Sequence, residues 1–376
     1  MNPIQMVDLT GQYAAFSEEM DNAILRVVRS GRYINGLEVQ TFAEALSDYT
    51  GARYIVPCAN GTDALQIALM ASGLTPGDEV IVPAFTYAAA VEAVALLQLT
   101  PVIVDVEAET FNIDANKIRE AISPKTKAII PVHLFGQTAD METILNISSG
   151  NNLFVIEDNA QSIGSEFIFS NETKKQAGTI GNVGALSFFP TKNLGCYGDG
   201  GAMMTDDEAL AKKLKMITQH GQAVKYHHQL IGCNSRLDTL QAAVLTVKLQ
   251  YLDRFTDSRR NVAGFYLEQL AELSEHIILP SVQSYSTPVY NQFTIRVNHG
   301  KRDDLQAFLK DKKIPAIVYY PLPIHQQAAF RNISRIGGDL SISENLCNSV
   351  LSLPVHTELD HEQLNYIVEQ IKSFFN

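Results

Sequence analysis

The chain has 376 residues, a formal net charge of −12 at pH 7 and 46% hydrophobic residues. This length and apolar content are enough for a large core and for two domains in one compact subunit. The acidic balance argues against a nucleic-acid-binding protein, which usually presents a basic face. The four cysteines are far apart and form no CxxC pair, which favours reduced, buried thiols over a zinc site or a disulfide framework.

The N-terminus and the longest apolar run give no sign of export or membrane insertion. The first ten residues lack a basic segment followed by an apolar core, so we expect no signal peptide. The most apolar long run, residues 87–99, contains Glu92 and Gln98 and is shorter than the roughly 20 apolar residues of a membrane span. We therefore expect a cytoplasmic protein with neither a membrane nor a nucleic-acid partner.

In chain order, helical spacing of apolar residues over 12–30 and 38–49 is followed by alternating strands and helices. The predicted strands are 54–58, 79–83, 102–106, 128–132, 153–157, 183–189 and 201–205, and helices are predicted at 62–72, 88–98, 115–121 and 141–148. Apolar strands separated by helices predict an α/β fold with a mostly parallel seven-stranded sheet covered by helices. Residues 165–177 are polar and are expected to form a surface hairpin.

The pattern changes after residue 206 and predicts a smaller α+β domain. Helices are predicted at 208–219, 237–251, 302–312, 342–351 and 361–374, with a long polar helix ending near 273 and strands at 290–297 and 315–319. We place the boundary near residue 250, which gives a large α/β domain, 1–250, and a small C-terminal α+β domain, 251–376.

Lys192 lies between an apolar run that ends at Pro190 and a glycine-rich segment, 195–201. Loops after strand ends often carry chemistry in α/β folds, and the glycines permit tight turns and close approach to a bound group. A lysine there can be a phosphate-binding charge or a Schiff-base nucleophile. A lone lysine is more often a solvated surface charge, so the rest of the chain has to decide.

Three other groups follow predicted strands. Gly61 and Thr62 open a helix and predict an anion site, with a plain N-cap by Asn60 or Thr62 as the alternative. Asp158 follows a buried strand and needs a cationic partner, unless it forms a salt bridge or caps the next segment. Tyr87 can stack on a flat ligand or belong to the core.

Together these groups suit pyridoxal phosphate. The phosphate needs a helix N-terminus, the ring a stacking partner, the pyridine nitrogen an acid, and the aldehyde an amine. Competing phosphate motifs are missing, because the chain has neither GxxxxGK[ST] nor a strand–GxGxxG–helix with a following acid. A metal role for Glu157 and Asp158 is weak, since neighbouring strand residues point to opposite faces, and we expect no metal.

Long segments of the chain resemble the DegT–StrS sugar aminotransferases, a family of fold-type I pyridoxal phosphate enzymes. The matching segments are NGTDAL (60–65), GDEVIVPAFTY (77–87), EDNAQS (157–162), SFFPTKNLGCYGDGGA (187–202) and NSRLDTLQAAVL (234–245). Within the family the chain is most similar to enzymes that aminate a UDP-2-acetamido-2-deoxy-3-keto-hexuronate.

The resemblance implies roles for individual residues at the cofactor. Lys192 is the Schiff-base lysine and proton shuttle, and Asp158 pairs with the pyridine nitrogen. Gln161 reaches the ring hydroxyl, and Asn234 crosses a dimer interface to the neighbour's phosphate. The implied cofactor-binding set is Gly61, Thr62, Tyr87, Asp158, Gln161, Ser187, Lys192 and Asn234.

The substrate side follows from the resemblance in less detail. Arg236 is a candidate for binding a substrate carboxylate, with an ion pair to Asp238 as an equal alternative. Hexuronate-type relatives often carry His-Tyr where this chain has Tyr319-Tyr320. The other candidate pocket residues are Tyr33, His133 and His325, and a structural role for each histidine is at least as expected.

The resemblance thus implies a homodimeric transaminase with shared active sites, which moves an amino group from L-glutamate to a nucleotide-linked keto sugar. Our best candidate is UDP-2-acetamido-3-keto-glucuronate, in bacterial surface polysaccharide (O-antigen) biosynthesis. Related dehydratases carry histidine at the lysine position, so Lys192 favours transamination. The alternatives are a C3 or C4 aminotransferase of a dTDP- or UDP-linked 6-deoxy-keto sugar, and a regulatory or sensor protein that keeps the fold.

Overall fold

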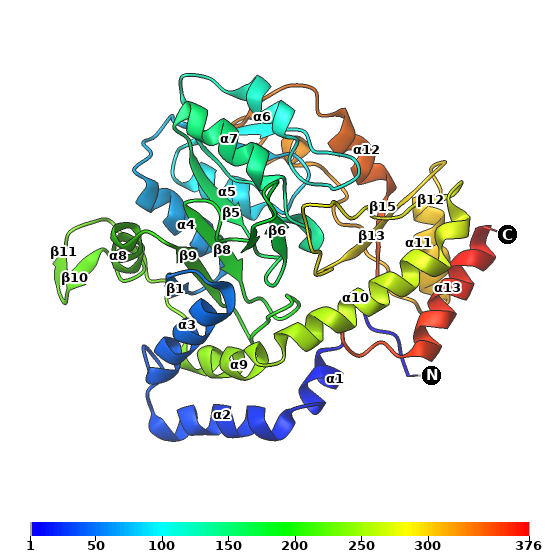
Figure 1. The fold of residues 1–376 in the computed structure, drawn as a ribbon, viewed down its shortest axis with the longest axis horizontal. Helices are drawn as coiled ribbons and strands as arrows, with labels where there is room; N and C mark the ends of the chain where they lie inside the picture. Colours follow the sequence, from blue (N-terminus) through cyan, green and yellow to red (C-terminus); the bar gives the residue numbers. More distant parts are fainter. Residues whose placement is uncertain (1, 376) are drawn as a thin grey trace.

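The computed structural model describes residues 2–375 and is built around one large sheet (Figure 1). This sheet has eight strands in the order β1-β9-β8-β5-β4-β2-β3-β14. The strands are β1 (Tyr54–Cys58), β2 (Glu79–Pro83), β3 (Thr100–Val104), β4 (Thr126–Ile129), β5 (Phe154–Asp158), β8 (Val183–Ser187), β9 (Gly201–Thr205) and β14 (Arg335–Ile336). Neighbours from β8 to β14 are parallel, and β9 is antiparallel to both β8 and β1.

The predicted mostly parallel α/β sheet is confirmed, with all seven predicted strands in it. The eighth strand, β14, was not predicted, because two residues give no periodic pattern. Arg335 holds it in place: its Nε and Nη2 donate to the carboxylate of Glu79 on β2 at 2.9 and 2.8 Å.

Helices cover both faces of the sheet, as the nearly continuous burial along its strands requires. Val80 and Val82 on β2 lie in one core, and Ile81 between them lies in the other. The first core is covered by α4 (Gly61–Ser72), α5 (Ala89–Leu96) and α8 (Glu208–Ile217). The opposite face is covered by α6 (Ala115–Ala121), α7 (Met141–Asn151), α3 (Leu37–Thr50) and α9 (Thr239–Leu249).

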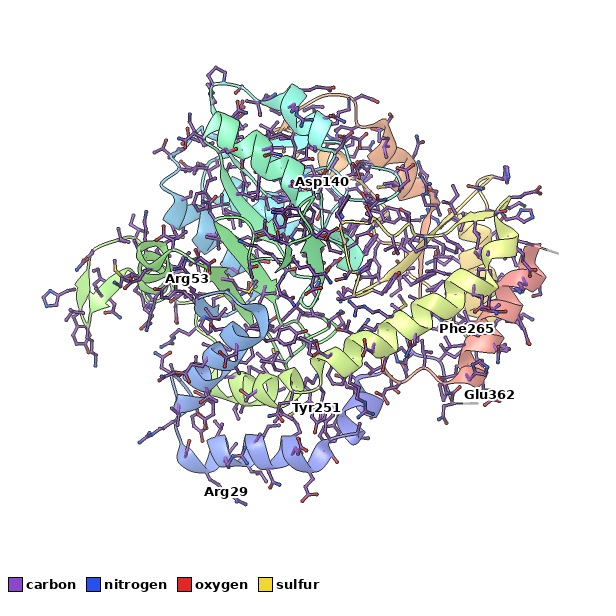
Figure 2. The ribbon with its side chains drawn as sticks, viewed as in Figure 1. Arg29, Arg53, Asp140, Tyr251, Phe265 and Glu362 are labelled. Carbon is purple, nitrogen blue, oxygen red and sulfur yellow. The ribbon has the colours of Figure 1, made fainter. Side chains whose placement is uncertain are left out.

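The helical pattern predicted over 12–30 is broken at Phe16 into α1 (Leu9–Ala14) and α2 (Ser17–Ser30). Phe16 leaves the helical conformation, with φ −144° and ψ 32°, and its ring stacks on Tyr251 at 5.4 Å. Tyr251, labelled in Figure 2, lies at the junction of α9 and α10 (Leu252–Gln269). Burial of an aromatic pair therefore outweighs one uninterrupted helix.

The C-terminal part forms a second core around a small antiparallel sheet, β12-β13-β15. Its elements are β12 (Ile277–Ile278), β13 (Phe293–Val297), β15 (Val350–Leu353), α11 (Arg302–Asp311), α12 (Ser341–Ser349) and α13 (His361–Phe375). The predicted hairpin within 165–177 is confirmed as β6 (Glu166–Ile168) and β7 (Lys174–Gln176). The proposed division into domains at residue 250 stays a prediction.

Two predictions in this part are wrong. Residues 315–319 form no strand, and Ile317 makes only an isolated bridge to Ser352. The helix predicted over 342–351 ends at Ser349, because Val350–Leu353 pairs with β13 as a strand. Both errors come from pairing between distant segments, which local propensity does not encode. Among the helices of residues 2–375, each is too short or too polar to cross a bilayer.

Candidate active site

The loop after β8 brings Lys192 back over the carboxyl edge of the sheet. Lys192 donates its backbone N–H to the carbonyl of Phe189 at 2.8 Å, and Cys196 donates to Phe188 at 2.8 Å. The loop is so tightly folded that a Cβ on Gly195 would lie 2.3 Å from the Pro190 carbonyl oxygen. This glycine is therefore needed by the chain's own packing, and not only by a bound ligand.

Asp158 ends β5 and lies in the same region as Lys192. Its side chain is 8% exposed, and Oδ1 accepts a hydrogen bond from the backbone N–H of Ala160 at 3.1 Å. Burial raises the pKa of Asp158, while Lys192 and His133 oppose that rise. Burial also lowers the pKa of Lys192, and the charge of Asp158 partly opposes it. The lysine is thus shifted toward the neutral amine that a nucleophile or a proton acceptor needs.

The N-terminus of α4 meets the end of β8. Asn60 caps the helix by accepting from the N–H of Asp63 at 2.8 Å, so the N-cap predicted as an alternative does form. A Cβ on Gly61 would lie only 2.6 Å from Cβ of Ser187, which shows how closely the two segments approach. Thr62 Oγ1 has no hydrogen-bonding partner among the described residues. A free hydroxyl, a serine and a helix N-terminus offer hydrogen-bond donors of the kind that bind a phosphate, and we call this group, Gly61, Thr62 and Ser187, the phosphate cup.

A group of aromatic and amide side chains lies beside this cup. Tyr87 is 63% exposed, and its ring centroid is 6.4 Å from that of Tyr320. Gln161 accepts from the N–H of Phe135 at 2.6 Å and donates to the Tyr320 hydroxyl at 3.4 Å. Burial raises the pKa of Tyr320, so its hydroxyl stays a donor over the physiological range. Tyr319 lies next to Tyr320, and the centroids of their rings are 6.0 Å apart.

The two candidate histidines are held by structural contacts. His133 is fully buried; its Nε2 lies 2.8 Å from Glu157, and its Nδ1 accepts from the N–H of Ala139 at 3.1 Å. His325 Nε2 lies 3.0 Å from the carboxylate of Glu344 on α12. These contacts match the structural reading weighed for both residues from the sequence.

Glu157 is buried beside the candidate site and holds the backbone there through hydrogen bonds, a role that was not predicted from the sequence. Its buried carboxylate accepts from the N–H groups of Gly178, Ile180 and Gly181 at 2.8, 2.7 and 2.6 Å, besides its contact with His133. An acid inside an apolar strand was the available signal. Among residues 2–375 no group of three His, Cys, Asp or Glu side chains is placed to hold a metal ion.

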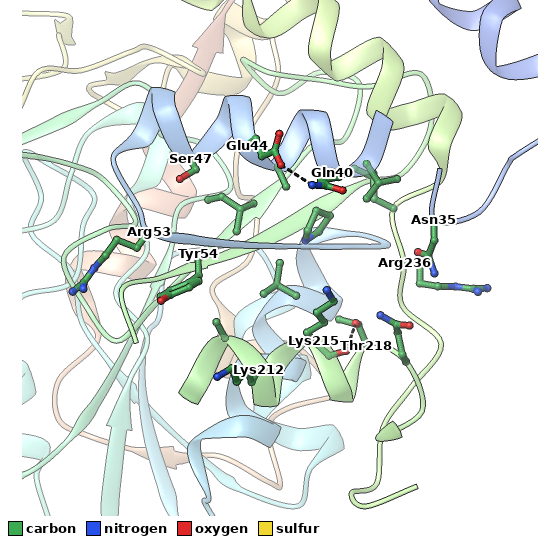
Figure 3. A pocket seen from close by; sticks show the side chains of 18 of the residues that line it. Asn35, Gln40, Glu44, Ser47, Arg53, Tyr54, Lys212, Lys215, Thr218 and Arg236 are labelled. Carbon is green, nitrogen blue, oxygen red and sulfur yellow. Dashed lines mark hydrogen bonds between the residues drawn. The ribbon is translucent and has the colours of Figure 1, made fainter. Parts of the chain in front are cut away.

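Arg236, Tyr33 and Asn234 lie around the start of α9. Arg236 lines a cavity of about 960 Å³ between α3, β1 and α8, and Figure 3 shows it beside Asn35 at one end. The alternative ion pair with Asp238 is not formed among the described residues. Tyr33 is 49% exposed and donates its hydroxyl to the Val28 carbonyl at 3.2 Å.

Asn234 is exposed, and the residue after it anchors this segment near the phosphate cup. Ser235 Oγ accepts from the N–H of Ala59, just before α4, at 3.0 Å. Asn234 therefore lies close to the carboxyl end of β1, at the surface of the chain. Its predicted crossing to a neighbouring chain remains a prediction.

The residues present fit pyridoxal phosphate. Gly61, Thr62 and Ser187 would hold the phosphate, and the exposed ring of Tyr87 offers a stacking surface. Lys192, with a pKa lowered by burial, offers the amine, and the buried carboxylate of Asp158 offers a partner for a protonated ring nitrogen.

Comparisons with known proteins agree with this chemistry. The model of the DegT/DnrJ/EryC1/StrS aminotransferase family matches residues 15–372. A pleiotropic regulatory protein of Geobacillus stearothermophilus is 44% identical over 373 residues, covering 99% of this chain and 98% of the relative. The UDP-2-acetamido-2-deoxy-3-oxo-D-glucuronate aminotransferase of Pseudomonas aeruginosa is 43% identical over 364 residues, covering 97% and 98%.

The fold also matches solved structures. The crystal structure of NtdA from Bacillus subtilis with bound cofactor PMP has a TM-score of 0.87 and 35% identity, covering 95% of this chain and 81% of that chain. The match over most of both chains confirms the fold-type I architecture that the sequence resemblance implied.

Proposed function

Because this chain belongs to the DegT/DnrJ/EryC1/StrS aminotransferase family of pyridoxal-phosphate-dependent nucleotide-sugar aminotransferases, we propose that it transfers an amino group from L-glutamate to UDP-2-acetamido-3-keto-glucuronate. The 43% identity to the Pseudomonas enzyme over nearly both whole chains supports this substrate. The product is a 3-amino sugar, which we assign to surface polysaccharide synthesis in the cytoplasm.

The proposed chemistry uses the neutral amine of Lys192. Bound pyridoxal phosphate would supply an aldehyde and an electron-withdrawing ring that stabilises negative charge next to the amino carbon. Lys192 Nζ takes the proton from the donor's α-carbon and later releases it, so the same amine acts first as a base and then as an acid. Asp158 would keep the ring nitrogen protonated, and the N-terminus of α4 would hold the phosphate. L-Glutamate gives up its amino group to the holoenzyme and takes an oxygen from water to leave as 2-oxoglutarate. In the second half the amino group replaces the keto oxygen of the sugar, which leaves as water, and the same residues act in reverse.

The unpaired guanidinium of Arg236 supports the uronate assignment, although the cavity that it lines includes none of the proposed cofactor-binding residues. Its guanidinium has no acidic partner among the described residues, so it is free to bind a carboxylate through two N–H groups. A 6-deoxy sugar offers no such carboxylate at C6. The choice between a hexuronate and a 6-deoxy-keto sugar therefore depends on this side chain.

Arg236→Ala should reduce kcat/KM for the keto-uronate by about tenfold or more and leave a 6-deoxy-keto sugar nearly unaffected. Arg53→Ala is the matched control, because Arg53 lines the same cavity and only pairs at the surface with Asp206 at 3.7 Å. The measurement is amino-sugar formation from a panel of keto sugars with and without the C6 carboxylate. Equal losses on both sugar classes, or wild-type preference for a 6-deoxy sugar, would replace the uronate with the alternative substrate.

The regulatory alternative has support in the name of the Geobacillus relative. A regulatory protein needs to bind a ligand but has no use for a lysine that moves protons. The two readings separate by absorbance: the enzyme, loaded with pyridoxal phosphate, loses its yellow colour when L-glutamate is added. A loaded protein whose spectrum L-glutamate leaves unchanged would favour the regulatory reading.

A further inference from the structure

Arg259, on α10, is a buried cation without an acidic partner. It is 3% exposed, and burial lowers its pKa to about 10. Its Nη1 donates to three backbone carbonyls, those of Tyr290, Asn291 and Val355, at 3.2, 3.3 and 2.8 Å. Burial of an unpaired charge is costly, so these carbonyl contacts are what keeps the guanidinium in place.

Arg259 is hydrogen-bonded to a constrained turn, residues 289–292. Tyr290 has φ 46°, a left-handed conformation that a bulky residue rarely adopts. The N–H of Val289 donates to the carbonyl of Gly136 at 2.9 Å, and a Cβ on Gly136 would lie 2.7 Å from the Tyr290 nitrogen. The surrounding structure must therefore hold this turn in its conformation.

The turn is hydrogen-bonded directly to the residue after Lys192. Asn291 Nδ2 donates to Asn193 Oδ1 at 2.9 Å, and Asn193 Nδ2 donates to the Val289 carbonyl at 3.1 Å. Both asparagines are buried, at 4% and 3% exposure. These two bonds are a fixed connection between the lysine loop and a turn nearly one hundred residues later in the chain.

The same turn touches the other side of the site. Gln292 donates its N–H to the Phe135 carbonyl at 3.4 Å, and the N–H of Phe135 donates to Gln161. Through this turn, Arg259 is connected both to the lysine loop and to the segment that orients Gln161. Figure 1 shows α10 running from α9 to α13. The hydrogen bond of Arg259 to the carbonyl of Val355 also connects the turn to the C-terminal core, which contains Val355.

We propose that Arg259 is a positioning residue for Lys192: it fixes the 289–292 turn, and Asn291 and Asn193 fix the lysine loop to that turn. This inference rests on the role proposed for Lys192. The residue touches neither substrate nor cofactor, and its effect passes through hydrogen-bonded neighbours.

The test measures the reactivity of Lys192 itself in the full-length, cofactor-free protein. The rate of Lys192 acylation by a small amine reagent is followed as a function of pH by mass spectrometry. Arg259→Met and Asn291→Ala should each loosen the loop and admit water. The acylation profile should then move to higher pH, and Lys192 should react about tenfold more slowly at neutral pH. Arg259→Lys, which keeps the charge, should recover part of the loss.

Arg260→Met is the matched control. Arg260 follows on the same helix and donates to the carbonyls of Pro288 and Thr287 at 3.0 and 3.4 Å, just before the turn. Its removal should leave the Lys192 profile at wild type. The double variant of Arg259 and Asn291 should lose no more than either single variant, because both act through one connection.

Stability is measured beside reactivity, by urea unfolding of each variant. Arg259→Met and Asn291→Ala proteins that lose stability but keep the wild-type Lys192 profile would overturn the proposal, as would additive effects in the double variant. If Arg259→Met does not fold, Asn291→Ala alone decides, since it removes a single side-chain hydrogen bond. Acylation needs no cofactor, so the result is independent of whether Lys192 is the residue that binds pyridoxal phosphate.

Discussion

At the scale of single residues, burial shifts the pKa of several ionisable groups. Lys192 and Asp158 are shifted in opposite directions by the same desolvation. His356 is a third case: burial, aided by Arg259, lowers its pKa to about 4. Its Nδ1 accepts from the N–H of Glu358 at 3.2 Å, and it is 3% exposed. The folded protein therefore holds His356 neutral.

His356 should make stability depend on pH in a definite window. In the unfolded chain His356 has the ordinary histidine pKa of 6.5, whereas in the folded chain its pKa is about 4. The unfolded state thus holds more protons between these values, so the free energy of unfolding should rise from about pH 4 to about pH 6.5. The gain is about 3 kcal/mol, and it levels off above that window.

The check is urea unfolding at several pH values for the wild type and for His356→Asn. The variant lacks the titrating group, so its stability should vary less across the window. A wild-type slope that survives unchanged in His356→Asn would assign the pH dependence to other groups.

The sequence identified the residues next to strand ends and missed those that support them. Lys192, Asp158, Gly61 and Tyr87 follow apolar runs, and the order of a parallel sheet predicts that they meet. The Asn193–Asn291 bond joins residues with no local pattern in common. Such contacts depend on tertiary packing, which no short window of sequence contains.

At the scale of elements, the close approach of α4 and β8 sets the positions of Gly61 and Ser187 in the proposed phosphate cup. Gly61→Ala would place a methyl group 2.6 Å from Cβ of Ser187, so helix and strand would have to move apart. We expect the affinity for pyridoxal phosphate to fall about tenfold, because the N–H groups of the helix would no longer converge on the phosphate. Equilibrium titration followed by absorbance measures this.

Gly264→Ala is the control for that substitution. Gly264 lies inside α10, and a Cβ there would meet nothing within 4 Å. It should stabilise the protein by about 0.5–1 kcal/mol and leave cofactor affinity unchanged. Tight cofactor binding in Gly61→Ala would show that the phosphate sits elsewhere.

Helices and strands were predictable where their own residues show a run or a regular spacing of apolar side chains. They were not predictable where only pairing with a distant strand defines them. The central strands β2 and β5 are almost wholly buried and were found with small errors at their ends. Strand β14 exists because Arg335 pairs with Glu79, and β15 because it aligns with β13. Neither has a repeating pattern of its own.

At the scale of the molecule, exposed side chains precede the start of α9, where we propose that a second copy of the chain binds. Tyr226 and Ile231 are 78% and 88% exposed, and they precede Asn234 and Arg236 in the sequence. Tyr226 lies in the turn of the hairpin β10 (Gln222–Val224) and β11 (His227–His228), which stands away from the body in Figure 1, and Ile231 follows β11. Apolar side chains on such a projection favour an interface.

A shared active site predicts complementation between two inactive variants. Lys192→Ala and Asn234→Ala should each be inactive or nearly so. Unfolded together and refolded as an equal mixture, half of the dimers would carry one site with both residues intact. The mixture should then recover about a quarter of the wild-type activity. A mixture no more active than its parents would place Asn234 in the site of its own chain.

The central claim is that Lys192 is the residue that bonds to the cofactor. Lys248 provides a stringent comparison, because it is 1% exposed and burial lowers its pKa to about 8, with its ammonium over the ring of Tyr197 at 4.8 Å. The most direct measurement is to load the full-length protein with pyridoxal phosphate, reduce it with borohydride, digest it and map the modified peptide by mass spectrometry. The account predicts one modification, on Lys192, and none in Lys192→Ala. A modification on Lys248, or an unmodified Lys192 in a protein with full transaminase activity, would contradict it.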